Sequence, residues 1–491
     1  GFFLQALTPD ADPRTSEALF VALPPGAPSP AQGERMRARG WVAELAGVTG
    51  LHRVELLEHC GNAPLQPERL ELSADELPGE RWEGMWITLP ETWTLLDTSE
   101  LRARGEVSVS STGRRYAPGH PLGERAEQNA APLWVLSGLE ESALDWARAG
   151  LAAQRLRLGA RTEGMDGVVL TGSARRLGAT GAPDFRAPPF EPPRDPPPGS
   201  LRIVALNLDN YFAAPGVRGA SSAAEHARQR AKLVAQLGPL DADILALTEL
   251  GNDASDGGVP ASLSELLGAL NSDAPGSEPY QVNESGADGS DVIRSAIAYR
   301  TRRVRPAGSA QFANSPVFRR APVLQVFEAE THRFTVAVVH FKSKSCSAGE
   351  SALGAEGCGA LARQAEAREL AAVSSSLPPH DASELLLIGD FNSDAREAPL
   401  AELRRLGLVD LLDLVPIAER YSYVFEGRAS LLDHALASSA LAARLAQAQI
   451  WHSNADAPEL LGYDLDNPPD AYQPNALRAS DHDPLVIDLE L

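Results

Sequence analysis

Cysteine, lysine and long apolar runs are all scarce in this chain of 491 residues. No stretch of 18 apolar residues occurs, so we expect no membrane-spanning helix. Lys232, Lys342 and Lys344 are the only lysines, and the net charge is −22. An acidic balance of this size argues against the binding of polyanions through a broad basic surface. It fits a cation-binding site, or a protein that works in salt.

The three cysteines are Cys60, Cys346 and Cys358. Cys346 and Cys358 enclose a segment rich in Gly, Ser and Ala, and a disulfide between them would stabilise the fold by roughly 3 kcal/mol. We predict that disulfide, which implies an oxidising compartment; two unrelated thiols are the alternative. Because the chain begins with Gly1, we expect a processed or trimmed N-terminus, with Cys60 either free or paired with a removed residue.

Proline marks the clearest boundary in the sequence. Residues 186–200, "RAPPFEPPRDPPPGS", contain seven prolines and predict a stiff, extended linker. The linker separates residues 1–185 from residues 201–491, and we treat these as two domains of different character.

Residues 1–185 consist of short apolar runs between Gly/Pro turns, such as "ALFVALP" and "GEVSVSS". This spacing predicts a small β-rich barrel or sandwich of OB type. Two helical stretches, 74–78 and 140–156, interrupt the strands. Three tryptophans either stack on bases, as aromatic residues of OB surfaces do, or pack in the core, which we favour; they are Trp82, Trp86 and Trp93.

Residues 201–491 alternate apolar strands, such as "LRIVALNL" and "ELLLIGDF", with amphipathic helices, such as "AAEHARQRAKLVAQL". The strands are apolar along nearly their whole length, so both faces of each strand must be covered. We therefore predict sheets packed on each other with helices outside, an α/β sandwich.

Polar residues recur where these buried strands end. In "LLLIGDFN", Asp390 and Asn392 are two residues apart and face the same side of a strand. An anionic acceptor beside an amide suits a phosphate, a metal-bound water or a sugar hydroxyl, and capping of the next helix is the alternative. Other strands end or begin in the same way, with Asn207, Glu249, His340, Asp433, Asp481 and His482.

Each of these residues has a plain structural alternative, such as a turn residue or a hydrogen-bonded core histidine. So many of them at strand ends predict a metal or hydrolytic site instead. Oxygen donors dominate and no cysteine lies near the motifs, so Mg²⁺, Mn²⁺ or Ca²⁺ is favoured over zinc. A hard cation and histidine acid–base groups together act on phosphate esters.

Seven segments resemble, in order, the motifs of the endonuclease/exonuclease/phosphatase superfamily: "LRIVALNLDNYF", "DADILALTELGND", "AIAYR", "FTVAVVHFKSK", "LLLIGDFNSD", "YSYVFEGRASLLDHALAS" and "SDHDPLVIDLEL". The likeness is to its bacterial extracellular nuclease branch, of the ExeM/NucH type with a deoxyribonuclease-I-like catalytic domain. It covers residues 201–491 densely and the front of the chain loosely. It implies a four-layer α/β sandwich, made of two mostly antiparallel sheets flanked by helices and preceded by an OB-like β-rich domain.

The resemblance also implies a role for each residue. Glu249 and Asp481 resemble the carboxylates that bind the metal, with Asn207 beside them. His482 resembles the base that activates the attacking water, and Asp433 the carboxylate that orients it.

Three further residues complete the implied catalytic set. Asp390 and Asn392 would hold the attacking water and the scissile phosphate, and His340 resembles a phosphate ligand or the acid for the leaving group. Weaker candidates are Arg320, Lys342 and Arg363 for phosphate contact, and Tyr421 and Tyr423 for the substrate groove. The sequence departs from the branch at Gly251, where an acidic residue is expected, and in "GCGALAR", which lacks an aromatic-Asn pair.

Together these features predict a secreted nuclease that hydrolyses DNA, with RNA as a second substrate, and that depends on Mg²⁺ or Mn²⁺, with Ca²⁺ as a third candidate. We expect a bacterial monomer that is extracellular, periplasmic or at the cell surface. Two alternatives stay open: a phosphodiesterase of the same fold that acts on lipid or inositol phosphates, and a non-catalytic surface protein that binds extracellular DNA through the OB-like region.

Overall fold

The computed structural model of the chain describes residues 1–491 except 11, 13, 46, 72–79, 124–132, 138–155, 171–174, 182, 254–257, 274–276, 284–290 and 347–353. The chain divides into two compact units: Gly1–Arg115 with Arg125–Pro189, and Tyr116–Glu124 with Phe190–Leu491. The helical stretches predicted at 74–78 and 140–156 lie outside the described residues, apart from Leu156. The fold is mixed α/β with several sheets, as predicted.

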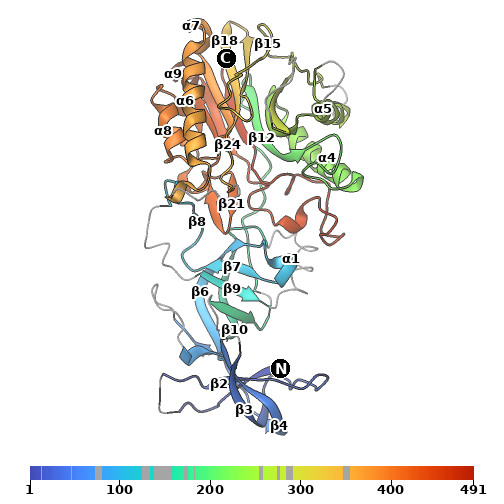
Figure 1. Ribbon diagram of the computed structural model, residues 1–491, viewed down its shortest axis with the longest axis vertical. Helices are drawn as coiled ribbons and strands as arrows, with labels where there is room; N and C mark the ends of the chain where they lie inside the picture. The colour runs from blue at the N-terminus through green and yellow to red at the C-terminus, as the bar shows by residue number, and fades with distance from the viewer. Residues whose placement is uncertain are drawn as a thin grey trace. The chain divides into compact units, whose positions relative to one another are not determined.

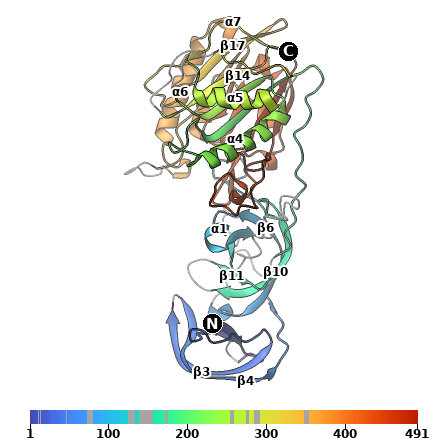
Figure 2. The same cartoon turned by 90° about the vertical axis from the view of Figure 1, so that its right-hand side faces the viewer.

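The first unit is rich in β-structure, which confirms the prediction for the front of the chain. One sheet has four strands in the order β1-β2-β4-β3 and curves strongly (Figure 2). The other contains a closed ring, because β10 pairs with both β11 and β6, and β9 and β7 complete the circle. The elements are β1 (Phe2–Gln5), β2 (Ala18–Val21), β3 (Glu34–Leu45), β4 (Val48–Asn62), β5 (Glu68–Arg69), β6 (Trp86–Asp97), α1 (Leu101–Arg104), β7 (Val107–Ser110), β9 (Leu133–Ser137), β10 (Arg161–Leu170) and β11 (Arg176–Ala179). The short strand β8 (Arg115–Tyr116) lies at the boundary between the two units and is in neither of these sheets.

Two of the three tryptophans singled out in the sequence belong to the core of this unit. Trp93 is fully buried and packs edge-on against Trp134, with ring centroids 6.5 Å apart. Trp82 is also buried, and Trp86 is half-buried. Trp82 and Trp93 therefore pack in the core, the alternative that we favoured over base stacking.

In the second unit, two sheets face each other. The first has the strand order β14-β13-β12-β25-β24, and the second β15-β17-β18-β19-β23-β20 with β16 beside β17. Their inner faces share one hydrophobic core, to which Ile203 and Ile244 contribute from the first sheet and Val336 and Ile388 from the second. The strands are β12 (Leu201–Tyr211), β13 (Ile244–Gly251), β14 (Ile293–Tyr299), β15 (Arg305–Pro306), β16 (Gln311–Phe312), β17 (Val323–Ala329), β18 (His332–His340), β19 (Leu385–Asp390), β20 (Val409–Asp410), β21 (Tyr423–Phe425), β22 (Arg428–Ser430), β23 (Asp433–Ala437), β24 (Leu445–Ile450) and β25 (Leu485–Leu489).

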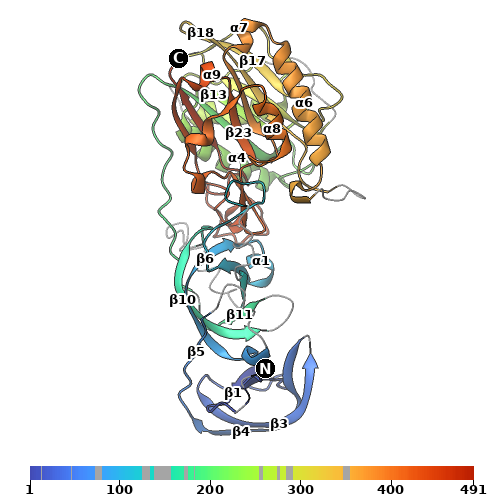
Figure 3. The same cartoon turned by 90° about the vertical axis from the view of Figure 1, so that its left-hand side faces the viewer.

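Helices cover the outer faces of both sheets. Helices α4 (Ala223–Leu237) and α5 (Ala261–Asp273) contribute leucines to a second hydrophobic cluster, on the first sheet. Helices α6 (Ala360–Ser376) and α8 (Ala398–Arg404) do the same on the second sheet. Figure 1 shows the two pairs on opposite sides of the sheets, and Figure 3 shows the α6 and α8 side. Two single-turn helices, α7 (Pro379–Ala382) and α9 (Ser439–Ala442), complete the set of described α-helices.

The second half of the proline-rich segment packs on this unit. The ring of Phe190 stacks on Trp451 with centroids 5.6 Å apart, and Trp451 Nε1 donates a hydrogen bond to the carbonyl of Glu191. Arg194 N donates to the side chain of Gln449 over 3.0 Å. Among the described helices of the whole chain, none combines the length and the apolar character needed to cross a membrane.

Candidate active site

Neighbouring strands of the second sheet bring three of the predicted site residues side by side. His340 ends β18, Asp390 ends β19 and Asp433 begins β23. Their pairing aligns His340 with Asp390, and Asp390 with Asp433. Because β18 and β19 are parallel and β23 runs the other way, two strand ends and one strand start meet at the same edge of the sheet.

A hydrogen-bonded dyad forms at this edge. Nδ1 of His482 lies 2.7 Å from Oδ2 of Asp433, which also accepts a 2.7 Å hydrogen bond from the hydroxyl of Ser422. Burial alone would lower the pKa of His482, but the negative charges of Asp433 and Asp481 outweigh it and hold this pKa well above its usual value. With Nδ1 bound to the carboxylate, Nε2 is the ring nitrogen that can exchange a proton with a reactant.

Asp390 and Asn392 meet in the way that their spacing suggests. Asn392 donates twice to Asp390, from its backbone N over 2.7 Å and from its amide over 3.1 Å. Asn207 Nδ2, in the second half of β12, adds a 3.2 Å hydrogen bond to Asp390 Oδ2 and so links the two sheets. Asn392 adopts a left-handed backbone conformation (φ 47°), which is uncommon outside glycine and is found at functional sites. The capping alternative is not favoured, since the Asn392 amide bonds Asp390 and the Phe341 carbonyl, and Glu397 is the residue before α8.

Three carboxylates gather on the side of the first sheet. Glu249 lies two residues before the end of β13 with a left-handed backbone (φ 56°), and Asp481 precedes His482. Asp209, which we did not single out in the sequence, joins them. Burial raises the pKa values of Asp209 and Glu249, and the charge of Asp481 raises both further. Carboxylates this close repel one another, and a divalent cation would offset that repulsion.

The donor set around this cluster fits a hard cation. Asp209, Glu249, Asp481 and the nearby Asn207 offer oxygen ligands only, as Mg²⁺, Mn²⁺ and Ca²⁺ prefer. A second group of possible ligands, among the described residues, consists of Asp390, Asp433 and His482. In that group His482 Nδ1 and Asp433 Oδ2 bond each other, which favours proton transfer over metal binding there.

His340 is buried without a hydrogen-bond partner for either ring nitrogen among the described residues. Its Nε2 lies 3.5 Å from Asp390 Oδ2 and 3.7 Å from Glu249 Oε1. Burial lowers the pKa of His340 well below its usual value, and the positive charges of Arg320 and His482 lower it further. An orphaned, neutral imidazole between the dyad and the carboxylates can donate a hydrogen bond to a substrate oxygen.

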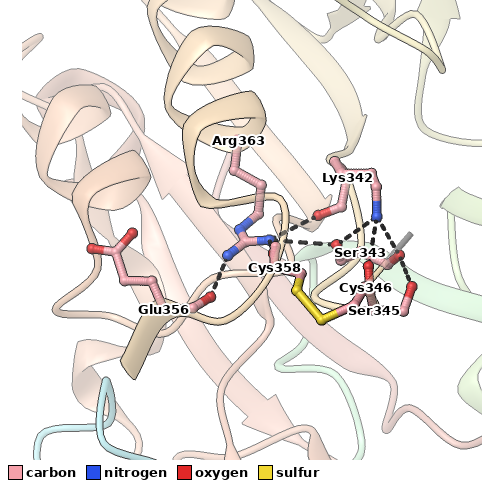
Figure 4. Close-up of a disulfide and its surroundings, with 7 residues drawn as sticks. All are labelled: Lys342, Ser343, Ser345, Cys346, Glu356, Cys358 and Arg363. Carbon is pink, nitrogen blue, oxygen red and sulfur yellow. Dashed lines mark hydrogen bonds between the residues drawn. A yellow bond between two sulfur atoms is a disulfide. The ribbon is translucent and has the colours of Figure 1, made fainter. Parts of the chain in front are cut away.

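The three basic candidates for phosphate contact have protein partners. Arg320 donates to the carbonyl of Phe341, next to His340. Arg363 donates to backbone carbonyls that include Cys358 (2.7 Å) and Glu356 (2.5 Å), and Lys342 Nζ donates to Ser343 and Ser345 (Figure 4). Arg363 and Lys342 thus bond backbone groups on either side of the Cys346–Cys358 disulfide. The presence of this disulfide confirms the predicted pairing. Cys60 is an exposed free thiol.

Of the two tyrosines expected at the groove, Tyr423 lies at the dyad, with its ring centroid 4.7 Å from that of His482. Tyr421 is buried, donates a hydrogen bond to Asp456 and stacks on His452 at 4.1 Å. Sequence reasoning missed Asp209 and Ser422. Asp209 was visible as the residue two positions after Asn207, whereas nothing in the sequence marks Ser422 as the partner of Asp433.

Comparison with known proteins gives one family match. Residues 206–482 match the Endonuclease/Exonuclease/phosphatase family. No curated protein matches the chain. Three solved structures that resemble it cover about the same part of the chain. A D. rerio TDP2 humanized by 14 mutations is 13% identical and covers 60% of this chain and 100% of its own, with a TM-score of 0.40. The human Nocturnin catalytic domain is 18% identical (60% and 95%, TM-score 0.36), and a Bacteroides thetaiotaomicron mannosyl-6-phosphatase is 17% identical (59% and 99%, TM-score 0.38).

The family match spans more than half of the residues and runs from the middle of β12 to His482. It therefore encloses the strand ends that carry the site, and the chain belongs to the endonuclease/exonuclease/phosphatase family.

Proposed function

We propose that this chain is a divalent-metal-dependent phosphodiesterase whose substrate is DNA, with RNA as a second substrate. Members of the family are phosphodiesterase and phosphatase hydrolases that generally use divalent metals. The observation that carries the proposal is the 2.7 Å hydrogen bond between Asp433 and His482, placed beside the carboxylates Asp209, Glu249 and Asp481. A general base and a set of oxygen ligands in one site are what hydrolysis of a phosphate ester requires.

The residues divide the chemistry as follows. His482 accepts the proton of the attacking water at Nε2, and Asp433 keeps the Nδ1 proton in place and stabilises the imidazolium that forms. Asp390 orients the water, and Asn392 contacts the scissile phosphate. His340 binds a phosphate oxygen as a neutral donor, since its lowered pKa suits that role better than the role of acid.

The carboxylates Asp209, Glu249 and Asp481, with Asn207, would hold the divalent ion. A bound Mg²⁺ or Mn²⁺ would neutralise charge on the phosphate in the transition state. Asn207 is buried and the three carboxylates are partly buried, which strengthens each of these electrostatic interactions.

Further features support the choice of a secreted nuclease. The motifs quoted above resemble the extracellular nuclease branch, and a disulfide suits an oxidising compartment. We propose that the ring formed by β6, β7, β9, β11 and β10 is an OB-type barrel, which its five strands support. We likewise propose a four-layer sandwich for the second unit, supported by helices on the outer faces of both sheets.

The test is incubation of supercoiled plasmid with the protein and EDTA, Mg²⁺, Mn²⁺ or Ca²⁺, beside the variant His482→Ala. His332→Ala is the matched control, because His332 is a partly exposed histidine that pairs with Glu384 outside the site. We expect metal-dependent nicking that His482→Ala loses and His332→Ala keeps. Turnover of sphingomyelin or an inositol phosphodiester without nicking would replace DNA by a lipid-type substrate. DNA binding with no cleavage in the presence of any of the three ions would contradict the proposal that the chain is a phosphodiesterase.

A further inference from the structure

A short segment from the front of the chain is built into the second unit. Residues 116–123, here called the strap, lie outside the family match and belong to the second unit, although the chain up to Arg115 belongs to the first. The strap ring of His120 is fully buried and stacks on Tyr116, with centroids 4.4 Å apart. Such a buried polar segment must have hydrogen-bond partners in the unit that it enters.

Those partners are two backbone carbonyls, of Ala418 and Arg420, which lie just before Ser422 in the chain. Tyr116 Oη donates to the carbonyl of Ala418 over 2.8 Å, and His120 Nε2 contacts that of Arg420 over 2.8 Å. The backbone N of Leu122 donates to His120 Nδ1, which leaves the ring proton on Nε2 and makes His120 a donor to Arg420. Between them, the carbonyl of Glu419 lies 3.1 Å from His452 Nε2.

Ala418 and Arg420 are followed in the chain by residues that contact the dyad. Two residues after Arg420, the Ser422 hydroxyl donates to Asp433, and its carbonyl accepts from Asp483 N, next to His482. Tyr423 follows and covers the ring of His482. A shift of this loop along the chain direction would therefore move the hydroxyl away from Asp433.

The other side of the strap fixes the loop that follows Asn392. Gly119 accepts a hydrogen bond from Arg396 N, and a Cβ on Gly119 would come within 2.7 Å of Asp394 Cβ. Asp394 Oδ1 in turn accepts from Leu431 N, two residues before Asp433. The strap thus contacts both loops that border the dyad.

We propose that the strap is a positioning element of the active site, in which Tyr116 and His120 set the placement of Ser422 and Tyr423 against the His482–Asp433 dyad. The proposal rests on the proposed function for its kinetic consequence, but the hydrogen bond that it concerns exists without substrate. A strap that only stabilises the fold would affect unfolding and leave the dyad unchanged.

The experiment compares Tyr116→Phe, His120→Gln and His120→Ala with Tyr280→Phe. Tyr280 is the matched control, because its hydroxyl donates to the carbonyl of Ala242 in the same unit, away from the site. His120→Gln keeps an N–H that can reach Arg420, and so tests rescue. The two readouts are kcat and KM on plasmid, and the downfield proton NMR signal of the hydrogen-bonded Nδ1–H of His482, assigned with His482→Gln.

We expect His120→Ala to lower kcat about tenfold or more with little change in KM, since a misplaced catalytic group affects the reacting geometry. We expect Tyr116→Phe to show a smaller loss, His120→Gln to recover part of it, and Tyr280→Phe to keep the wild-type kcat. The NMR signal should weaken through faster solvent exchange in His120→Ala and persist in Tyr280→Phe.

The proposal would be overturned if His120→Ala and Tyr116→Phe had the kcat and the NMR signal of the wild type, whatever their melting temperatures. If the wild type cleaves no phosphodiester, the NMR comparison still decides whether the strap positions the dyad. The failure of the proposed function and the failure of this inference are therefore distinguishable.

Discussion

Asp433 and His482 lie 49 residues apart in the chain and share a 2.7 Å hydrogen bond. Asp433 begins β23 in the second sheet, whereas His482 precedes β25 in the first. The dyad therefore joins the two sheets and depends on their packing.

Replacement of this carboxylate tests the dyad through its pH dependence. The charge of Asp433 helps to raise the pKa of His482 above its usual value, and a base acts only when it is neutral. Activity of the wild type should therefore rise with pH on the alkaline side of that usual value. In Asp433→Asn the midpoint of this rise should move to lower pH, and the plateau should fall by about 10²–10⁴-fold. A pH–rate profile checks both; a midpoint that stays in place would show that Asp433 does not set this pKa.

Because Asn392 has a left-handed backbone, replacement by glycine can separate the effect of its side chain on activity from the effect of its backbone conformation on stability. Asn392→Gly removes the amide and suits a φ of 47°. We expect lower kcat with an unchanged or higher melting temperature, measured by steady-state kinetics and thermal unfolding. Glu330→Gly is the control, because Glu330 has a similar φ (52°) in a turn outside the site, and its activity should stay that of the wild type.

Two buried histidines should respond in opposite ways to replacement by leucine. His340 has no hydrogen-bond partner among the described residues, so His340→Leu should keep or raise the unfolding free energy and abolish activity. His434 contacts Asp410 and the carbonyl of Ser393 with its two ring nitrogens. His434→Leu should cost about 3–5 kcal/mol, since it removes the 2.7 Å partner of the buried Asp410 and leaves that carboxylate with Leu412 N and a 3.9 Å contact to Arg404. Urea unfolding measures both, and a large loss in His340→Leu would contradict the functional explanation of its missing partners.

Repulsion among the carboxylates of Asp209, Glu249 and Asp481 predicts how strongly a bound metal ion stabilises the fold. Burial and the charges of Asp481 and Glu249 raise the pKa of Asp209, so its ionised form is unfavourable near neutral pH. Asp209→Asn should raise the melting temperature in EDTA and reduce the further rise on addition of Mg²⁺. Differential scanning fluorimetry gives both values. A variant that matches the wild type in EDTA and in Mg²⁺ would remove Asp209 from the cluster.

The disulfide should contribute to stability through the unfolded state. The double variant Cys346→Ser with Cys358→Ser should lose about 3 kcal/mol of unfolding free energy, as expected for a loop of this length. Cys60→Ser is the control and should unfold like the wild type, because Cys60 is exposed and unpaired. An equal loss in the wild type on addition of reductant would confirm the cause.

The sequence was sufficient to find the residues at the ends of buried strands. Asp390, Glu249 and His340 follow apolar runs. Strand pairing then aligns His340 with Asp390, and the packing of the two sheets brings Glu249 within 3.7 Å of His340. The partners of charged side chains were not visible in the same way. Arg363 is close in sequence to the motifs, as a phosphate ligand would be. It donates instead to backbone carbonyls beside the disulfide. Ser422 and the strap could not be predicted, because a single serine, histidine or glycine forms no recognisable sequence motif. Only the fold places Ser422 against Asp433 and Gly119 against Asp394.

The strap also has a consequence for the order of events during synthesis. Tyr116 and the carbonyl of Ala418 are separated by 302 positions in the chain. At about 5–20 residues per second, a ribosome would need about 15–60 s to complete the distance. Throughout that interval the strap has no carbonyl partner at Ala418, so this contact within the second unit can form only once most of that unit has been made. Pauses in translation between these two points would lengthen the time in which the strap of the nascent chain is exposed to proteases.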